Sequence, residues 1–417
     1  MENPANEQLN TQENISSEFA SKEPLVYKTT IKKYALIVLS GLLGLSIIIT
    51  AVVIYLRIMD RLNVTEPTPP VTPTPTPEPA KTESPLISYI KNDKSIWIVN
   101  TDGTDKKLLI ELPGSSDQTF SDLAWKSKGF LSYSLCDAKQ VCTIDTYNLD
   151  TKSSVTEINN SEKGLIESLT WAPENKFMGY FQYKEQGNEN QTVELRLKTG
   201  TTNSVLSSHK TEIKDIEQVS KVTFSADENH IAFGFVELVA STSGRSGKTV
   251  TYTAKPTILI YRVSGVLLDT IVGAKDPMFI DEKTIAYQKD GQLIHREIGT
   301  SSETSMTPIS GFNLDVSPDK SKYAYWSPTG GFSDALLIIF DANLNLQRNI
   351  LRGVLFPKWL NNSTVVGIKA DNCLGSKCEL FDYQTISLAT VNIETKQANP
   401  IDQGRTIKDV EVNYYAD

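Results

Sequence analysis

The longest uninterrupted apolar run of the chain extends from Tyr34 to Leu56 and reads YALIVLSGLLGLSIIITAVVIYL, without a charged residue. At 1.5 Å per residue it forms a helix about 34 Å long, enough to cross a hydrocarbon core of about 30 Å. The run is longer than the apolar region of a cleaved signal peptide, and it is apolar on every face, unlike a buried core helix. The pattern predicts an uncleaved transmembrane signal anchor at residues 34–56.

From Leu86 onward the pattern changes to short runs in which apolar and polar residues alternate, with no helical period of any length. The first unit predicts strands at Ile87–Ile90, Ser95–Val99 and Lys107–Leu112. The Asp102-Gly103 pair between the last two strands is typical of a tight turn, since glycine accepts positive φ without steric cost. The whole region is therefore predicted to be all-β.

A repeated unit organises this all-β region. It consists of a short apolar strand that often ends in an aromatic residue, a polar turn and a second strand. The first strand of the unit occurs seven times, beginning at Asp122, Ser168, Lys221, Asp276, Asn313, Phe356 and Asp409. Intervals of roughly 37 to 55 residues with four strands in each are typical of the blades of a β-propeller.

The two ends of the region complement each other. The opening unit at Leu86 has no inner strand, and the last copy, DVEVNYY at 409–415, has no strand after it. Together they would make one blade, close the ring and remove free strand edges. Residues 85–417 then divide into blades of about 48 residues. We predict a seven-bladed β-propeller in preference to six or eight blades, because six would leave one inner strand unassigned.

The repeat resembles a known family. The segments that carry the resemblance are Trp171-Ala172-Pro173-Glu174, Phe224-Ser225-Ala226-Asp227, Val316-Ser317-Pro318-Asp319 and IWIVNTDGT from Ile96 to Thr104. They resemble the TolB-like propeller repeat and the propeller half of dipeptidyl peptidase IV-type enzymes. In those enzymes a hydrolase domain accompanies the propeller, but this sequence has no G-x-S-x-G elbow, so the resemblance implies no serine-peptidase chemistry. It implies a binding or scaffolding module, although fold alone does not choose a function.

The segments around the apolar run predict its orientation. Residues 1–33 are polar without an apolar period and read as a disordered cytoplasmic tail. Four lysines precede the run and two arginines follow it: Lys22, Lys28, Lys32, Lys33, Arg57 and Arg61. This asymmetry places the N-terminus in the cytoplasm and the propeller outside it, at the cell membrane. The Thr-Pro-rich residues 57–84 are expected to form a semi-rigid polyproline stalk, with a flexible spacer as the alternative.

Composition excludes several kinds of site. There are 41 Lys and Arg against 50 Asp and Glu, a net charge of −9, so a nucleic-acid partner is not expected. Three histidines without ligand spacing predict no metal site, and no catalytic residue or cofactor is assigned. Trp125, Trp171 and Trp359 end inner strands and are expected to pack between blades.

The four cysteines fall into two close pairs, Cys136 with Cys142 and Cys373 with Cys378. In an oxidising compartment each pair is expected to form a disulfide across a hairpin turn. The alternative is four free thiols in a cytosolic domain. A four-cysteine zinc site is disfavoured because the C-x2-C spacing is absent.

Loop lengths indicate where a ligand would bind. The connections between the second and third strands are longer and more irregular than those between the third and fourth, which predicts one elaborated face. The alternative is that these connections gained residues by insertion without gaining a function. The candidate ligand-face residues are Tyr183, Arg245, Lys248, Trp326, Phe332 and Tyr383.

Two functions remain open from the sequence. The first is a membrane-anchored binding or scaffold module, whose partner is a protein or a cell-envelope polymer and whose oligomeric state is unassigned. The second is a hydrolase or lyase that acts on surface polymer at the same face. The scarcity of histidine and the absence of a nucleophile motif disfavour the enzyme. A carboxylate pair assembled from separate blades would leave no sequence motif.

Overall fold

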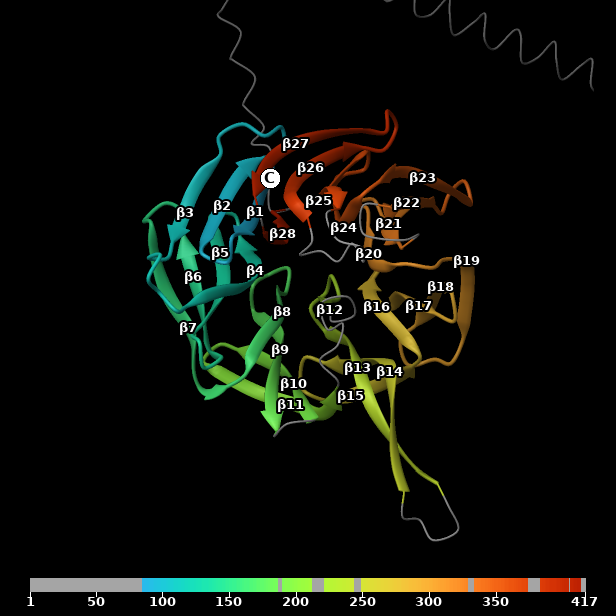
Figure 1. Cartoon of the computed structure of the whole chain (residues 1–417). Coiled ribbons are helices and arrows are strands. Elements are labelled where there is room, and N and C mark those ends of the chain that lie inside the picture. Colours follow the sequence, from blue (N-terminus) through green and yellow to red (C-terminus); the bar gives the residue numbers. More distant parts are fainter. Residues whose placement is uncertain are drawn as a thin grey trace, which may run out of the picture. The chain divides into compact units, whose positions relative to one another are not determined.

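Seven four-stranded antiparallel sheets are arranged around a common centre as the blades of a β-propeller (Figure 1). The computed structural model describes residues 85–417 except 187–189, 212–220, 244–248, 329–333, 374–382, 405 and 414–417. Three predicted segments lie outside the described part: the tail at 1–33, the anchor at 34–56 and the stalk at 57–84. Among the residues described, no helix has the length and apolar character needed to span a membrane.

Each blade runs outward from an innermost strand through two middle strands to an outermost strand. Blade 1 contains, from the centre outward, β28 (Ile407–Val412), β1 (Leu86–Lys91), β2 (Ser95–Asn100) and β3 (Lys107–Glu111). Blade 2 contains β4 (Thr119–Ser127), β5 (Phe130–Cys136), β6 (Val141–Asn148) and β7 (Ser153–Lys163). Blade 3 contains β8 (Leu165–Trp171), β9 (Phe177–Gln186), β10 (Asn190–Thr199) and β11 (Thr202–Thr211). Blade 4 contains β12 (Lys221–Phe224), β13 (His230–Ser243), β14 (Thr249–Arg262) and β15 (Leu267–Val272).

The remaining three blades follow the same order. Blade 5 contains β16 (Ala274–Phe279), β17 (Thr284–Lys289), β18 (Gln292–Glu297) and β19 (Glu303–Pro308). Blade 6 contains β20 (Phe312–Val316), β21 (Lys322–Ser327), β22 (Leu336–Asp341) and β23 (Leu346–Arg352). Blade 7 contains β24 (Val354–Asn361), β25 (Thr364–Cys373), β26 (Tyr383–Asn392) and β27 (Gln397–Gly404).

The last strand closes the propeller by pairing with the first. In this antiparallel pair Ile87 lies opposite Val412, and Lys91 lies opposite Ile407. The backbone N–H of Asn413 donates to the carbonyl oxygen of Leu86 at 2.9 Å. Figure 1 shows β28 beside β1. Both predictions are confirmed: the two ends of the region share one blade, and the blades number seven rather than six or eight.

The hydrophobic core lies between neighbouring blades, which explains the burial of each strand. The second strands are covered on both faces, so that β21, KYAYWS, has four consecutive buried residues. The outermost strands, such as β3 and β11, are mostly exposed. Phe181 of blade 3 meets Phe233 of blade 4 edge to face, with ring centroids 5.5 Å apart. Trp125, Trp171 and Trp359 are buried in such clusters, as predicted.

The up-and-down path of each blade gives the propeller two different faces. An innermost strand begins on the face where the second strand ends, so the connections between second and third strands share that face with the connections between blades. We call it the long-connection face. The turns between third and fourth strands lie on the opposite, short-turn face; examples are residues 149–152, 200–201 and 263–266.

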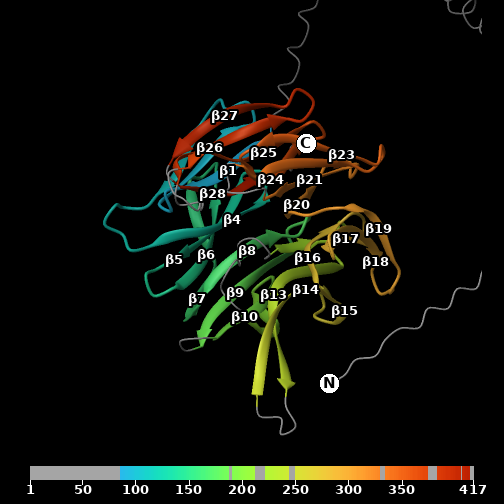
Figure 2. The same ribbon diagram turned by 45° about the vertical axis from the view of Figure 1, so that its right-hand side comes forward.

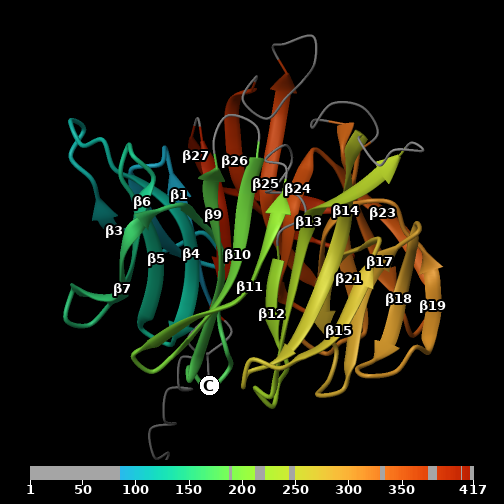
Figure 3. The ribbon, with the colours of Figure 1, turned by 90° about the horizontal axis from the view of Figure 1, so that it is seen from below.

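On the long-connection face, some blades carry extended hairpins and others only short turns. The β13–β14 hairpin pairs without interruption from His230 opposite Arg262 to Ser243 opposite Thr249. It extends well beyond the flanking β12 and β15, as Figure 2 shows. The β13–β14 and β25–β26 hairpins reach the same side of the molecule (Figure 3). In contrast, the connections at 92–94 and 290–291 are short turns.

Candidate functional site

Two of the predicted ligand-face residues belong to the core. Tyr183 is 4% exposed and packs with Phe181, their ring centroids 6.0 Å apart. Trp326 is 2% exposed, and its Nε1–H donates to Asn313 Oδ1 at 2.8 Å. Both lie on second strands, which neighbouring blades cover on both faces. Their aromatic character therefore reflects packing between blades, and neither side chain is part of an open loop surface.

The other predicted ligand-face residues are not placed by the structure. Arg245, Lys248 and Phe332 lie outside the described residues. Tyr383 begins β26, where its backbone lies opposite Cys373, but its side chain is outside the description. These four residues remain predictions.

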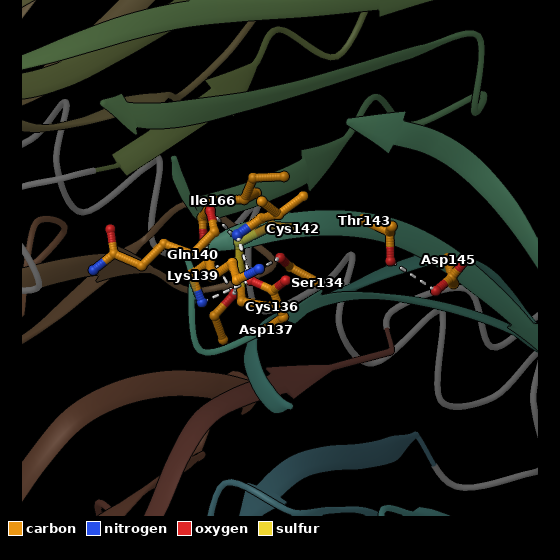
Figure 4. The surroundings of a disulfide bond; sticks show 11 residues. Ser134, Cys136, Asp137, Lys139, Gln140, Cys142, Thr143, Asp145 and Ile166 are labelled. Atoms are coloured by element: carbon orange, nitrogen blue, oxygen red, sulfur yellow. Dashed lines mark hydrogen bonds between the residues drawn. A yellow bond between two sulfur atoms is a disulfide. The ribbon is translucent and has the colours of Figure 1, made fainter. Parts of the chain in front are cut away.

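One of the two predicted disulfides is present. A bond joins Cys136 at the end of β5 to Cys142 near the start of β6, on the long-connection face (Figure 4). Beside it, Ser121 Oγ lies 3.4 Å from Cys136 Sγ and donates to the carbonyl oxygen of Ile166 at 3.2 Å. The disulfide thus borders the seam between blades 2 and 3. The second predicted pair lies outside the description, since Cys378 and the Cys373 side chain are not described.

A cavity of about 290 Å³ occupies the centre of the propeller, and residues of all seven innermost strands line it. The lining residues come mainly from the first halves of these strands, for example Ser121 and Asp122 of β4. Because innermost strands begin on the long-connection face, the cavity lies toward that face. No sequence motif indicated this cavity, since its lining is spread from β4 to β28.

β-Bulges in the innermost strands shape the cavity wall. Five lining residues adopt positive φ values between 48° and 55°: Ser168, Asp276, Asn313, Phe356 and Asp409. In each of these strands the pairing register shifts at this point. A bulge bends its strand and re-aims the adjacent side chains and backbone N–H groups. The same local distortion therefore recurs around the cavity, in residue types as different as Ser and Phe.

Two carboxylates of the cavity each join one blade to the next. Asp122 accepts hydrogen bonds from the backbone N–H of Leu123 at 2.8 Å and of Leu169, in the next blade, at 2.5 Å. Asp315 accepts from the backbone N–H of Trp359 at 3.0 Å. These bonds satisfy backbone donors that the bulges remove from the strand ladders.

Three lysines also line the cavity, and each has a partner. Lys358 Nζ donates to Glu411 Oε1 at 2.8 Å, and Lys221 Nζ donates to the carbonyl oxygen of Leu314 at 2.6 Å. Lys408 forms an ion pair with Asp93 at 2.7 Å, in the β1–β2 turn outside the lining. Lys358 therefore neutralises a carboxylate of the lining through a direct contact.

The electrostatics of the buried carboxylates follow from this arrangement. Burial and the nearby charges of Asp409 and Glu411 raise the pKa of Asp122 well above its usual value. Burial raises the pKa of Asp276 to about 6, although the charges of Lys275 and Lys221 partly oppose the effect. Burial lowers the pKa of Lys358, but Glu411 and Asp315 outweigh it and raise that pKa above its ordinary range. The protonated, neutral form is therefore favoured at Asp122 and Asp276, whereas Lys358 keeps its positive charge.

The chemistry that this lining permits is recognition of a polar group, because carboxyl, amide and hydroxyl side chains face the cavity beside apolar ones. In the described residues, no group of three or more His, Cys, Asp or Glu side chains is placed to hold a metal ion. His295 is half-buried, bonds through Nε2 to Tyr323 Oη at 2.7 Å, and does not line the cavity.

No protein-family model matches the chain, and no similar sequence was found among curated proteins. Solved structures do resemble it. A puromycin-hydrolyzing peptidase of Mycobacterium tuberculosis matches with a TM-score of 0.50 and 10% identity, over 81% of this chain and 56% of the peptidase. Tricorn protease matches with a TM-score of 0.50 and 13% identity, over 79% of this chain and 34% of the protease. A putative TolB from Agrobacterium tumefaciens matches with a TM-score of 0.43 and 13% identity, over 77% of this chain and 90% of that protein.

The likenesses to the two peptidases show the fold alone. The chain spans about half the length of the puromycin-hydrolyzing peptidase and about a third of tricorn protease. At 10% and 13% identity, a peptidase activity does not follow from them. They do not distinguish a binding role from a catalytic one.

Proposed function

We propose that the chain is a membrane-anchored extracytoplasmic binding protein, and that its partner, a protein or a cell-envelope polymer, binds on the long-connection face of the propeller. The observation that carries this proposal is the coincidence of two features on that face. The central cavity lies toward it, and the extended hairpins of blades 4 and 7 rise on the same side. Concave sites flanked by loops on a rigid scaffold are where binding proteins usually hold their ligands.

The proposed location rests on the sequence and on the cysteines. The run at 34–56 is long enough to span a bilayer, and the excess of lysines before it favours a cytoplasmic N-terminus. The Cys136–Cys142 disulfide is in keeping with an oxidising compartment, because such bonds are rare in the cytosol. The Thr-Pro-rich residues 57–84 would then hold the propeller away from the membrane.

Photo-cross-linking from the two faces tests the proposed face in the full chain. In one variant, a photoreactive amino acid replaces Lys139, in the β5–β6 turn on the long-connection face. In the matched control it replaces Thr151, in the β6–β7 turn of the same blade on the short-turn face. Both positions are exposed. In intact cells, we expect a discrete cross-linked species from position 139 and none from position 151. Cross-linking from position 151 alone, or equally from both positions, would contradict the proposal.

A further inference from the structure

The three histidines of the chain lie at three successive seams between blades. Each side chain meets a residue of the following blade: His209 with Glu237, His230 with Phe279, and His295 with Tyr323. Histidine is the side chain whose ordinary change of charge falls between about pH 5 and 8, so a proton gained at such a seam alters the contact between two blades. At the third seam, the surroundings of His295 oppose the gain of a positive charge.

His295, on β18, lies at the apolar seam between blades 5 and 6. Its side chain is half-buried, and its ring centroid lies 5.8 Å from that of Tyr323. Tyr323 is 1% exposed and belongs to a core cluster with Leu293, Leu314 and Phe340. An imidazolium at this seam loses contact with water, and burial lowers the pKa of His295 below its ordinary value of 6.5.

The hydrogen bond between His295 Nε2 and Tyr323 Oη, at 2.7 Å, depends on the protonation state of the imidazole. A neutral imidazole with its proton on Nδ1 accepts the phenol proton at Nε2, which satisfies the buried hydroxyl group. A protonated imidazole is a donor at both nitrogens, so it no longer accepts that proton. Among the described residues, His295 is the one hydrogen-bond partner of Tyr323 Oη. Protonation therefore leaves the hydrogen of a buried hydroxyl group without an acceptor, which disfavours the closed seam.

One charge near His295 favours its protonation. Asp281, in the β16–β17 turn, raises the pKa of the imidazole, but burial is the larger effect and the net change is downward. The Asp281 carboxylate also accepts hydrogen bonds from two backbone N–H groups of its own turn, at 2.7 and 2.8 Å. Across the strands, His295 lies opposite Ala286 on β17 and Thr304 on β19, which carry no charge, and the titratable group that it contacts from β21 is Tyr323. Asp281 thus reduces the effect of burial without cancelling it.

We propose that the contact of His295 with Tyr323 is an acid-sensitive clasp, and that the seam between blades 5 and 6 loosens when the imidazole gains a proton. Because β18 ends and β21 begins on the short-turn face, the loosening is greatest toward that face. Since the folded state lowers the pKa of His295, the clasp contributes its full stability above pH 6.5, and this contribution is lost as the pH falls below that value. The inference is independent of the proposed binding function, because neither residue lines the cavity.

Hydrogen–deuterium exchange of the purified full chain in detergent tests this inference at about pH 7.5 and about pH 5. Protection factors, corrected for the intrinsic pH dependence of exchange, are compared between two seams. The test seam is formed by β18 and β21, and the reference seam by β2 and β5 of blades 1 and 2, which contain no histidine. We expect protection of the test seam to fall at least about threefold more than that of the reference seam on acidification, since the opened seam takes up the proton.

Two variants assign the effect to one histidine. His295→Gln keeps a side chain that accepts the phenol proton but does not titrate, so we expect it to abolish the difference between the seams. His209→Gln is the matched control, because His209 lies at the seam between blades 3 and 4, where Glu237 is 2.9 Å away. We expect His209→Gln to keep the wild-type difference.

Two results would overturn the inference. The first is a wild-type protein whose two seams change equally between the two pH values, which is measured without any variant. The second is a difference between the seams that His295→Gln keeps or that His209→Gln removes. If His295→Gln does not fold, His295→Leu, whose side chain suits the apolar seam, replaces it under the same criteria.

Discussion

The pairing of β28 with β1 is the contact that closes the propeller, and its removal is the sharpest test of what holds the fold. Truncation of the chain after Thr406 deletes β28, which carries the buried residues Ile407, Val410 and Val412. These side chains pack in one cluster with Ile87 and others from blades 1 and 7. The deletion therefore exposes the inner edge of β1 and one side of blade 7 together.

The expected loss of unfolding free energy follows from the side-chain burial and the hydrogen bonds that β28 contributes. Full burial of an aliphatic side chain contributes about 1.5–3 kcal/mol, so three of them contribute on the order of 6 kcal/mol. About four ladder hydrogen bonds add roughly 1 kcal/mol each. The loss of about 10 kcal/mol is comparable to the whole free energy of unfolding of many domains, about 5–15 kcal/mol. We expect the truncated chain to lack a cooperative transition and to aggregate through the exposed edge.

Thermal unfolding and light scattering of the purified proteins in detergent measure the effect. The control is a chain with an internal deletion in the stalk, residues 65–82, which leaves every described residue in place. We expect the control to melt with the full-length chain. If the chain truncated after Thr406 stayed monodisperse and melted cooperatively within a few degrees of it, closure by β28 would not be what stabilises the ring.

Three further predictions concern the disulfide, a buried carboxylate and the topology. The double variant Cys136→Ala/Cys142→Ala is expected to lose about 2 kcal/mol of unfolding free energy in urea, because the bond closes a short loop; equal stability with or without the bond would contradict this. The pKa of Asp276 is raised to about 6, so the folded state favours the protonated carboxyl. The contribution of this carboxyl to the free energy of unfolding is therefore lost as the pH rises from about 4 to about 6. Relative to the Asp276→Asn variant, the wild-type protein should lose about 3 kcal/mol of unfolding free energy over this pH range. If the unfolding free energies of the two proteins ran parallel against pH, the raised pKa would be refuted. Protease added to intact cells should digest the chain beyond Leu56 and spare residues 1–33; digestion of the propeller only after lysis would reverse the topology.

The architecture could be predicted from the sequence because each blade repeats one simple pattern. Alternating strands, a period of blade size and turns such as Asp102-Gly103 all specify the same fold, and local signals that agree are what make a fold readable. Ring closure was predictable too, since the unpaired strand at 409–415 had one place to pair. The Cys136–Cys142 bond followed from two residues on facing strands of a hairpin.

The site was not predictable in the same way. The cavity is assembled from innermost strands that lie far apart in the sequence, and its shape depends on bulges at residues as unlike as Ser168 and Phe356. Tyr183 and Trp326 fit the pattern of exposed aromatics near long loops, but a second strand is covered by a blade on either side. Aromatic residues on such strands indicate packing. Charged residues within the innermost strands, such as Asp122 and Glu411, are the one signal in the sequence that could have indicated the cavity.

The claim that the long-connection face holds a ligand is tested most directly by asking whether the cavity is occupied in the native membrane. Carbodiimide labelling of carboxylates, read by mass spectrometry, is compared between native membranes and the purified full chain. Glu167 and Glu411 line the cavity, whereas Glu174 is largely exposed in the β8–β9 turn on the short-turn face. If the long-connection face holds a ligand, Glu167 and Glu411 should be labelled several-fold more slowly in native membranes than after purification, while Glu174 is labelled equally in both. Equal labelling of all three residues in the two samples would contradict the account.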